Sequence, residues 1–137
     1  LEKSERETYP TGNERILFID DEPALVSLAE GVLSKLGYKI TAKTSSTEAL
    51  DFFKQNPDQI DLVITDMTMP AMTGDKVARK IMEIRGDMPV ILCTGYSEHI
   101  SEEKAREMGI RAYLLKPLEM RGLATTIRRV LDGKHVK

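Results

Sequence analysis

The chain has 137 residues, 41% of them hydrophobic and 31% charged, which predicts one globular domain with its own core rather than two domains or a disordered chain. Its 20 Lys and Arg against 22 Asp and Glu residues give a net charge of −2, which argues against a dedicated nucleic-acid binder, since such proteins are usually basic. Its single cysteine, Cys93, excludes an internal disulfide and a cysteine-based zinc site and favours a cytoplasmic location, and no apolar run is long enough to span a membrane.

The two ends of the chain are polar. Residues 1–14 carry mixed charges and little that could be buried, so we expect a linker or a frayed tail there. Residues 132–137 are expected to form a C-terminal tail. The folded domain is therefore predicted to cover residues 15–131.

The first predicted strand and helix follow directly. Residues 16–19 are a continuous apolar run, too short for a helix and suited to a buried strand. A helix is predicted from Pro23, a favourable first-turn residue, to Gly37, which ends it. The apolar residues at helical spacing that we expect on its buried face are Leu25, Leu28, Ala29, Val32 and Leu36.

The second strand and helix have a different pattern. Residues 38–43 alternate apolar and polar side chains, as in an edge strand with one covered face. Ser46 or Thr47 can cap the following helix, which carries Leu50 and Phe53 and ends before the next proline.

The third and fourth strands are again wholly apolar. The run 62–64 leads to Asp66, and the run 89–93 leads to Thr94. Between them, a third helix is marked by Val77, Ile81 and Ile84 at helical spacing.

The last three elements close the domain. A helix of about ten residues is expected from near Ser101 to Met108, with Gly109 ending it. A fifth strand follows over 112–115 and ends at Lys116-Pro117. The closing helix carries Met120, Leu123, Ile127 and Val130 on one face.

Five strands alternating with five helices predict an α/β fold with a parallel sheet covered on both faces. The apolar first, third and fourth strands should be central, and the alternating second strand should lie at an edge. A single doubly wound (βα)5 domain with the flavodoxin-like strand order 2-1-3-4-5 satisfies these requirements.

The residues that end the strands are the candidates for chemistry, because ligands bind at the carboxyl ends of parallel strands. These residues are Asp20, Asp21, Asp66, Thr94 and Lys116. Carboxylates packed together repel each other and call for a cation, and oxygen ligands without a dedicated cage favour Mg²⁺. Mg²⁺ held in this way usually meets a phosphate as well, whose charge a lysine can balance. The set therefore predicts phosphoryl transfer, with a carboxylate as nucleophile.

At these residues the chain resembles the receiver domains of two-component response regulators over residues 15–131. The pieces that carry the resemblance stand in order, each at a predicted strand end: Ile19-Asp20-Asp21-Glu22-Pro23, Asp66-Met67-Thr68-Met69-Pro70 with Gly74, Thr94-Gly95 and Lys116-Pro117. The resemblance implies that Asp66 accepts a phosphoryl group from phosphohistidine. It also implies that Mg²⁺ is bound by Asp21, Asp66 and the backbone carbonyl of Thr68, with Asp20 acting through water.

The resemblance implies further roles near the site. Lys116 would pair with the phosphoryl group, and its bond to Pro117 would be cis. Thr94 and Tyr113 would form the conformational switch, Tyr113 swinging inward as the Thr94 hydroxyl moves onto the phosphoryl group. In this family the residues at Thr68 and Tyr96 tune hydrolysis, and since neither is an obvious helper of water, we expect a long phosphoryl lifetime.

Other functions remain to be weighed. A degenerate receiver that acts only as a protein-binding surface is the main alternative. A haloacid-dehalogenase-type phosphatase would need a second aspartate where Thr68 stands, and a nucleotide or flavin binder would need a glycine-rich fingerprint after the first strand, which is missing.

The resemblance also suggests partners. A sensor histidine kinase or a histidine phosphotransfer domain would supply or receive the phosphoryl group, and the face made by the fourth helix, fifth strand and fifth helix could support a homodimer. We expect no direct contact with nucleic acid or membrane. With no output domain after the last helix, the chain is either a free-standing regulator or, as we favour, the C-terminal receiver of a hybrid sensor histidine kinase.

Overall fold

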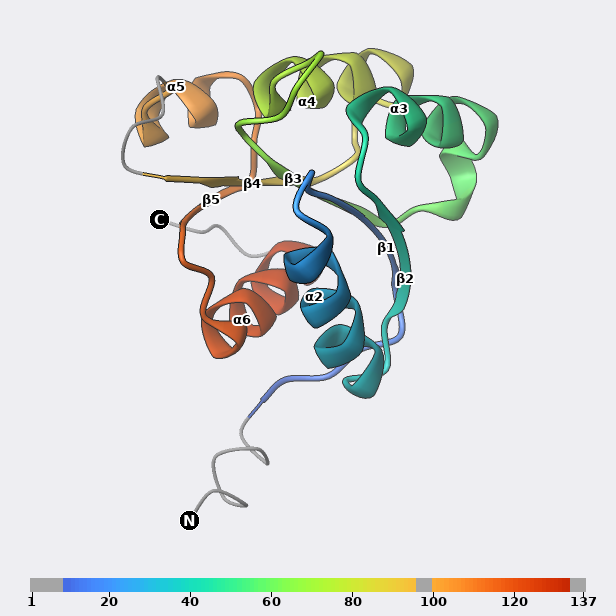
Figure 1. The fold of residues 1–137 in the computed structure, drawn as a ribbon, viewed down its shortest axis with the longest axis vertical. Coiled ribbons are helices and arrows are strands. Elements are labelled where there is room, and N and C mark those ends of the chain that lie inside the picture. Colours follow the sequence, from blue (N-terminus) through green and yellow to red (C-terminus); the bar gives the residue numbers. More distant parts are fainter. Residues whose placement is uncertain (1–8, 96–99, 134–137) are drawn as a thin grey trace.

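The computed structural model describes residues 9–95 and 100–133, and in them it contains the five strands and five helices expected from the sequence (Figure 1). The strands are β1 (Arg15–Ile19), β2 (Lys39–Lys43), β3 (Leu62–Asp66), β4 (Val90–Thr94) and β5 (Ala112–Leu115). The helices are α2 (Pro23–Lys35), α3 (Ser46–Gln55), α4 (Gly74–Ile84), α5 (Glu102–Glu107) and α6 (Met120–Leu131), with a short 3₁₀ turn, η1, at Pro57–Gln59.

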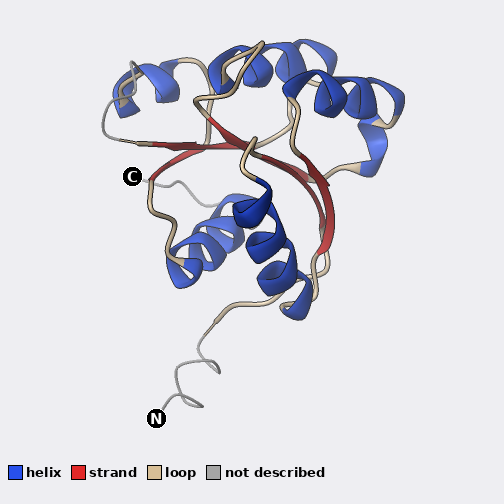
Figure 2. Ribbon diagram, in the orientation of Figure 1, coloured by secondary structure: helices blue, strands red, loops and turns tan. Residues whose placement is uncertain are grey.

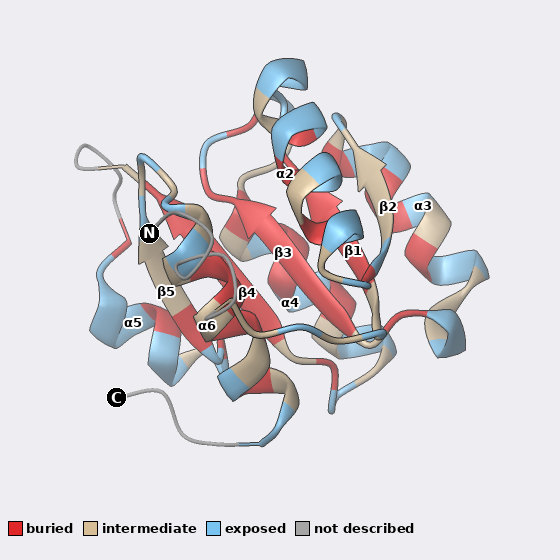
Figure 3. Cartoon of the chain, turned by 90° about the horizontal axis from the view of Figure 1, so that it is seen from below, coloured by how far each residue is buried: buried red, intermediate tan, exposed pale blue. Residues whose placement is uncertain are grey.

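The strands form one parallel sheet in the order β2-β1-β3-β4-β5, which confirms the predicted flavodoxin-like topology. In the register, Phe18 lies beside Ile64, and Ile64 lies beside Ile91. β3 and β4 are buried along their whole length, whereas β2 at the edge is not (Figure 3). The wholly apolar runs therefore occupy the centre of the sheet, as expected for strands covered on both faces.

The sheet is sandwiched between two layers of helices (Figures 1 and 2). α3, α4 and α5 cover one face, and α2 and α6 cover the other. Successive side chains of a strand point to opposite faces, so Leu17 and Ile19 pack with α3 and α4, whereas Ile16 and Phe18 pack with α2 and α6. Each such fully buried side chain contributes about 1.5–3 kcal/mol through removal of apolar surface from water.

The buried face of α2 differs from the predicted one. Val26, Ala29 and Leu33 are its buried residues, while Leu28 is 54% exposed. This segment carries apolar residues on more than one side, so spacing alone did not fix which side faces the sheet. The expectation that Leu28 is buried is wrong.

Two helix ends also differ from the prediction. α3 is capped by Ser45, whose hydroxyl accepts a hydrogen bond from the Glu48 amide at 3.3 Å, and not by Ser46 or Thr47. α5 has six residues instead of about ten. It begins after the cap Ser101, and Gly109 follows it with a φ of 98°, which a glycine adopts without strain.

The described residues before β1 lie against the body of the domain. The Gly12 amide donates to the Leu36 carbonyl at 3.1 Å, and Arg128 of α6 pairs with Glu14 at 2.6 Å. Among the residues that the structure describes, no helix has the length and apolar character needed to cross a bilayer.

Candidate functional site

A polar hollow of about 430 Å³ opens at the carboxyl ends of the central strands. Seven residues line it, drawn from the segments after β1, β3 and β5: Asp20, Asp21, Glu22, Pro23, Asp66, Thr68 and Lys116. Parallel strands bring their carboxyl ends to one edge, so these residues meet although the chain separates Asp20 from Lys116 by almost 100 positions. The hollow brings together the three predicted aspartates and the predicted lysine.

The three aspartates can hold one cation. Asp20, Asp21 and Asp66 each offer a carboxylate oxygen, and these oxygens all lie within 4.8 Å of one another. Asp20 and Asp66 are 2% and 4% exposed, whereas Asp21 is exposed. An all-oxygen set that is open on one side fits a hard cation that keeps some of its water, which is the preference of Mg²⁺.

Lys116 is the counter-charge of the two buried carboxylates. Its Nζ lies 2.9 Å from Oδ1 of Asp66 and 3.1 Å from Oδ2 of Asp20. The other oxygen of Asp20 accepts a hydrogen bond from the Glu22 amide at 2.9 Å. Burial lowers the pKa of the lysine, but its hydrogen bonds to Asp66 and Asp20 and the charges of these carboxylates together raise it above the ordinary value, which keeps the lysine charged.

Asp66 has a carboxyl group whose pKa is strongly shifted. Burial raises the pKa of its carboxyl group to about 6, with smaller increases from the neighbouring charges of Asp20 and Asp21, while Lys116 acts in the opposite direction. Burial disfavours the charged form of a carboxyl group. A cation in the hollow would favour the carboxylate, so metal binding and ionisation of Asp66 support each other.

The backbone holds Asp66 in place at the end of β3. The Met67 amide donates to the Cys93 carbonyl at 2.8 Å, and the Gly74 amide donates to the Met67 carbonyl at 2.8 Å. A Cβ atom at position 74 would overlap with the carbonyl oxygen of Asp66. Gly74 was part of the quoted pattern, but its steric role depends on how α4 approaches β3 and could not be read from the sequence.

Thr94 lies at the end of β4 and is fully buried. Its hydroxyl donates to the Gly95 carbonyl at 3.3 Å, and its own carbonyl accepts from the Lys116 amide at 2.8 Å. Thr94 is thus bonded to the backbone of the lysine that lines the hollow, although it does not itself line the hollow. The Lys116–Pro117 bond is cis, as the resemblance implied.

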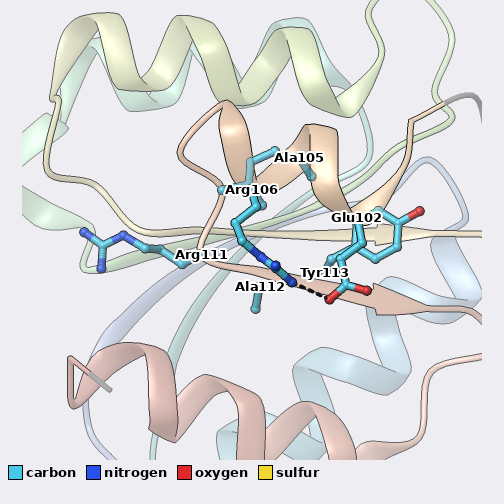
Figure 4. Close-up of a pocket in the computed structure, with 7 residues that line it drawn as sticks. Glu102, Ala105, Arg106, Arg111, Ala112 and Tyr113 are labelled. Atoms are coloured by element: carbon cyan, nitrogen blue, oxygen red, sulfur yellow. Dashed lines mark hydrogen bonds and ion pairs between the residues drawn. The ribbon is translucent and has the colours of Figure 1, made fainter. Parts of the chain in front are cut away.

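Tyr113 lies on β5, away from the hollow. Its hydroxyl donates to the Ile100 carbonyl at 2.8 Å, and its ring is half-buried. It lines a separate cavity of about 100 Å³ beside α5, with an ion pair between Arg106 and Glu102 at its rim (Figure 4). The structure therefore places the two predicted switch residues on neighbouring strands, with each hydroxyl bonded to a different backbone carbonyl.

Some predictions fall elsewhere. Tyr96, on which half of the expectation of a long phosphoryl lifetime depends, lies outside the described residues. Glu22 lines the hollow, and sequence reasoning assigned it no role. The signal that could have found it is its position directly after Asp20-Asp21 at the end of β1.

Comparisons with known proteins show which family the chain resembles. The family model for the response regulator receiver domain matches residues 16–128. A rice protein, two-component response regulator ORR24 of Oryza sativa subsp. japonica, is 33% identical over 95% of this chain, and the sensor kinase CckA of Brucella abortus (strain 2308) is 28% identical over 95% of it. The chain spans only 20% and 14% of the length of these two proteins.

A solved structure shows the same fold. The crystal structure of a response regulator receiver domain protein from Clostridium thermocellum has a TM-score of 0.83 and 34% sequence identity to this chain. The match covers 88% of this chain and 95% of that one. The likeness therefore extends over one complete domain.

Proposed function

The chain belongs to the response regulator receiver domain family of two-component signalling, and on this basis we propose that it is a phosphoacceptor module whose acceptor is Asp66. The observation that carries the proposal is the position of the Asp66 carboxylate. It lies at the end of a central strand, 2.9 Å from the Lys116 ammonium and beside two further aspartates. A nucleophilic carboxylate, a cation site and a fixed positive charge are together what phosphoryl transfer requires.

In the proposed reaction a carboxylate oxygen of Asp66 attacks the phosphorus atom of a phosphohistidine on a partner protein. The bond between phosphorus and the histidine nitrogen breaks, and the imidazole leaves with its electron pair and takes up a proton. An acyl phosphate on Asp66 is the product. The attack requires Asp66 to be ionised, and Lys116 promotes ionisation because it lowers the pKa that burial raises.

Receiver domains generally bind Mg²⁺ at an acidic pocket, and the donor set of this chain fits that ion. We assign the ion to Asp21 and Asp66, to the backbone carbonyl of Thr68, and to Asp20 through water. Bound there, Mg²⁺ would neutralise charge on the phosphoryl oxygens. The support for the indirect role of Asp20 is that both of its oxygens already accept hydrogen bonds, from Lys116 and from the Glu22 amide.

Lys116 has a second role in this proposal. Once the acyl phosphate forms, Asp66 no longer carries its full charge, and the ammonium can turn from the carboxylate to a phosphoryl oxygen. The Lys116 amide donates to the Thr94 carbonyl. A movement of the lysine backbone would therefore also shift the end of β4. This supports the assignment of Thr94 and Tyr113 as the switch, in which a local change of charge selects one of two conformations.

The alternatives have less support. A degenerate receiver would be expected to lack part of the acidic set, whereas Asp20, Asp21, Asp66 and Lys116 are all present around one hollow. An aspartyl-phosphate phosphatase would need an acid/base group two residues after the nucleophile. Position 68 is a threonine, which lines the hollow but cannot play that part at neutral pH.

Receiver domains interact with histidine kinases or phosphotransfer proteins, and we propose such a protein as the phosphoryl partner of this chain in the cytoplasm. The face made by α5, β5 and α6 is the proposed homodimer surface, and contact with nucleic acid is not part of the proposal. The likeness to the sensor kinase CckA of Brucella supports an origin in a hybrid histidine kinase. The match to the rice regulator also covers 95% of this chain, but the chain spans only 20% of that protein, so this likeness does not distinguish a hybrid kinase from another longer protein. A free-standing regulator is the alternative proposal.

The decisive experiment is intact-mass analysis after incubation with acetyl phosphate, with and without Mg²⁺. We expect a gain of one phosphoryl group that requires both Mg²⁺ and Asp66. Asp66→Asn, which keeps the size of the side chain, should show no gain, whereas Asp58→Asn, on the exposed turn η1, should behave as wild type. If the wild type gains no mass but still binds Mg²⁺, the test is repeated with a purified histidine kinase as the donor. Transfer of the phosphoryl group from its phosphohistidine to Asp66 would then be measured.

A further inference from the structure

Residues 9–14, here called the strap, cross α6 and the end of α2 before entering β1. Arg121 lies over the ring of Tyr9, with 5.6 Å from the guanidinium carbon to the ring centre, and Arg128 contacts Thr11 and Glu14. Residues seven apart lie on the same side of a helix, so the two arginines form one stripe along α6. The strap therefore contacts this stripe at both of its arginines.

Arg128 is the centre of the contact. Its Nη1 donates to the Thr11 carbonyl at 3.2 Å, to Glu14 Oε1 at 3.0 Å and to the Tyr38 hydroxyl at 3.3 Å. Its Nη2 donates to Glu14 Oε2 at 2.6 Å and to Asp132 Oδ1 at 3.0 Å. The two bonds to Glu14 form a bidentate pair, the strongest geometry for an arginine and a carboxylate. The Arg128 side chain thus joins the strap to the C-terminal end of α6.

The backbone of the strap is also fitted to its place. The Gly12 amide donates to the Leu36 carbonyl at 3.1 Å, and the Lys39 amide donates to the Glu14 carbonyl at 3.0 Å. A Cβ atom at Gly12 would overlap with the side chains of Arg128 and Tyr38, and one at Gly37 would overlap with the Gly12 carbonyl. Two glycines therefore allow a close approach that other residues would prevent.

The strap has few other means of attachment. Thr11 and Asn13 are exposed, and Tyr9, Pro10, Gly12 and Glu14 are only half-buried. A segment with little buried apolar surface opens locally at a lower free energy than the core of its domain. Its closure depends instead on polar contacts that converge on one guanidinium.

We propose that the strap is a latch that closes on α6 through Arg128 and opens as a unit without unfolding of the domain. While it is closed, the cationic stripe of Arg121 and Arg128 is occupied by the chain's own Tyr9 and Glu14. The Arg128 guanidinium becomes available to another acidic group once its bonds to Glu14 are released. The latch thus lies on a helix that begins four residues after Lys116 of the functional site.

The test is amide hydrogen exchange by NMR on the whole chain. The Gly12 and Lys39 amides report on the two sides of the latch, and the Val63 amide in β3, bonded to the Pro89 carbonyl, reports on the core. In the wild type, we expect Gly12 to exchange at least about a hundredfold faster than Val63, since local opening precedes unfolding. Equal protection of the three amides would show that the strap opens only with the domain and would overturn the proposal.

Single substitutions test whether Arg128 holds the latch closed. Arg128→Gln should speed exchange at Gly12 and Lys39 by about tenfold, the loss typical of a charged hydrogen bond, relative to any change at Val63. The matched control is Arg129→Gln, on the exposed side of the same helix, which should leave the ratio unchanged. Gly12→Ala should act like Arg128→Gln although it leaves α6 intact. Equal ratios in Arg128→Gln and Arg129→Gln would refute the role of Arg128.

Discussion

Gly74 lies against the backbone of Asp66, so close that a Cβ atom at position 74 would overlap with the Asp66 carbonyl oxygen. The first residue of α4 thereby fixes the end of β3, and its amide also holds the Met67 carbonyl. The position of the proposed phosphoacceptor therefore depends on a residue that has no side chain.

We predict that Gly74→Ala destabilises the fold by about 2 kcal/mol, because backbone atoms cannot move aside as a flexible side chain would. It should also slow phosphorylation by acetyl phosphate, since Asp66 must shift. Gly31→Ala is the matched control: position 31 lies inside α2 with nothing within 4 Å of the added Cβ, and alanine there should stabilise by about 0.5–1 kcal/mol. Urea unfolding measures both, and a neutral Gly74→Ala would contradict the steric argument.

Lys116→Met should change two properties in opposite directions. Loss of the ammonium beside Asp66 and Asp20 removes a positive charge that repels a cation, so the Kd for Mg²⁺, followed by NMR titration, should fall severalfold. Phosphorylation by acetyl phosphate should slow by about 10²-fold, the usual cost of removing one charge-stabilising donor. Lys80→Met, on the exposed side of α4, should change neither. A parallel loss of Mg²⁺ binding and phosphorylation would instead indicate a general disruption of the hollow.

Mg²⁺ should stabilise the folded chain through the three aspartates. At a concentration tenfold above its Kd, a ligand that binds only the folded state adds about 1.4 kcal/mol, and a chelator should remove this gain. Asp21→Asn should abolish the gain with little effect on the metal-free protein, because Asp21 is the exposed member of the set. Thermal unfolding with and without Mg²⁺ measures this. A full gain in Asp21→Asn would exclude that carboxylate as a ligand.

The strand-end chemistry could be predicted because the topology rule needs only the order of elements. Continuous apolar runs gave β1 and β3, and the aspartates that end or follow these strands meet in the hollow. The buried side of α2 could not be predicted in the same way, because several of its sides are apolar, and only packing against the sheet buries Val26 and Leu33. The cap of α3 could not be predicted either, because Ser45, Ser46 and Thr47 can all cap a helix. Which of them does so depends on the path of the chain between β2 and α3.

The strap shows a different limit. Its polar composition predicted a tail, and nothing within residues 9–14 reveals a partner 114 positions away in Arg128. The close approach of Gly74 to Asp66 is likewise a product of helix packing. Contacts of this kind depend on tertiary distances, whereas the predicted elements depend on local patterns.

Cys93 should be inert in the folded protein. It is buried in β4, and burial, with a further contribution from the Asp66 charge, raises the pKa of its thiol to about 12. Since the thiolate is the reactive form, labelling by a thiol reagent at pH 8 should be more than about 10³-fold slower than in denaturant, limited by opening of the core. Rapid labelling of native protein, measured by mass, would contradict the packing of β4.

The ion pair of Glu14 and Arg128 should make stability depend on pH. The hydrogen bond from Arg128 holds the pKa of Glu14 below its ordinary value of 4.5, against a smaller opposing effect of burial. A carboxyl group with a lowered pKa in the folded state stabilises above its unfolded pKa and loses this contribution as the pH falls through the folded one. Two other side chains accept hydrogen bonds from Arg128. The Tyr38 hydroxyl is uncharged at acidic pH, and Asp132 accepts through its carboxylate.

Glu14→Gln should therefore cost about 1 kcal/mol at pH 7, within the range for a partly exposed charged pair. The difference from wild type should be constant down to about pH 5, shrink below pH 4.5 and vanish once Glu14 is protonated in both states. Urea unfolding at several pH values measures it, with Glu30→Gln on the exposed side of α2 as the control. A difference that persisted at pH 2 would show that the glutamate contributes by packing rather than by its charge.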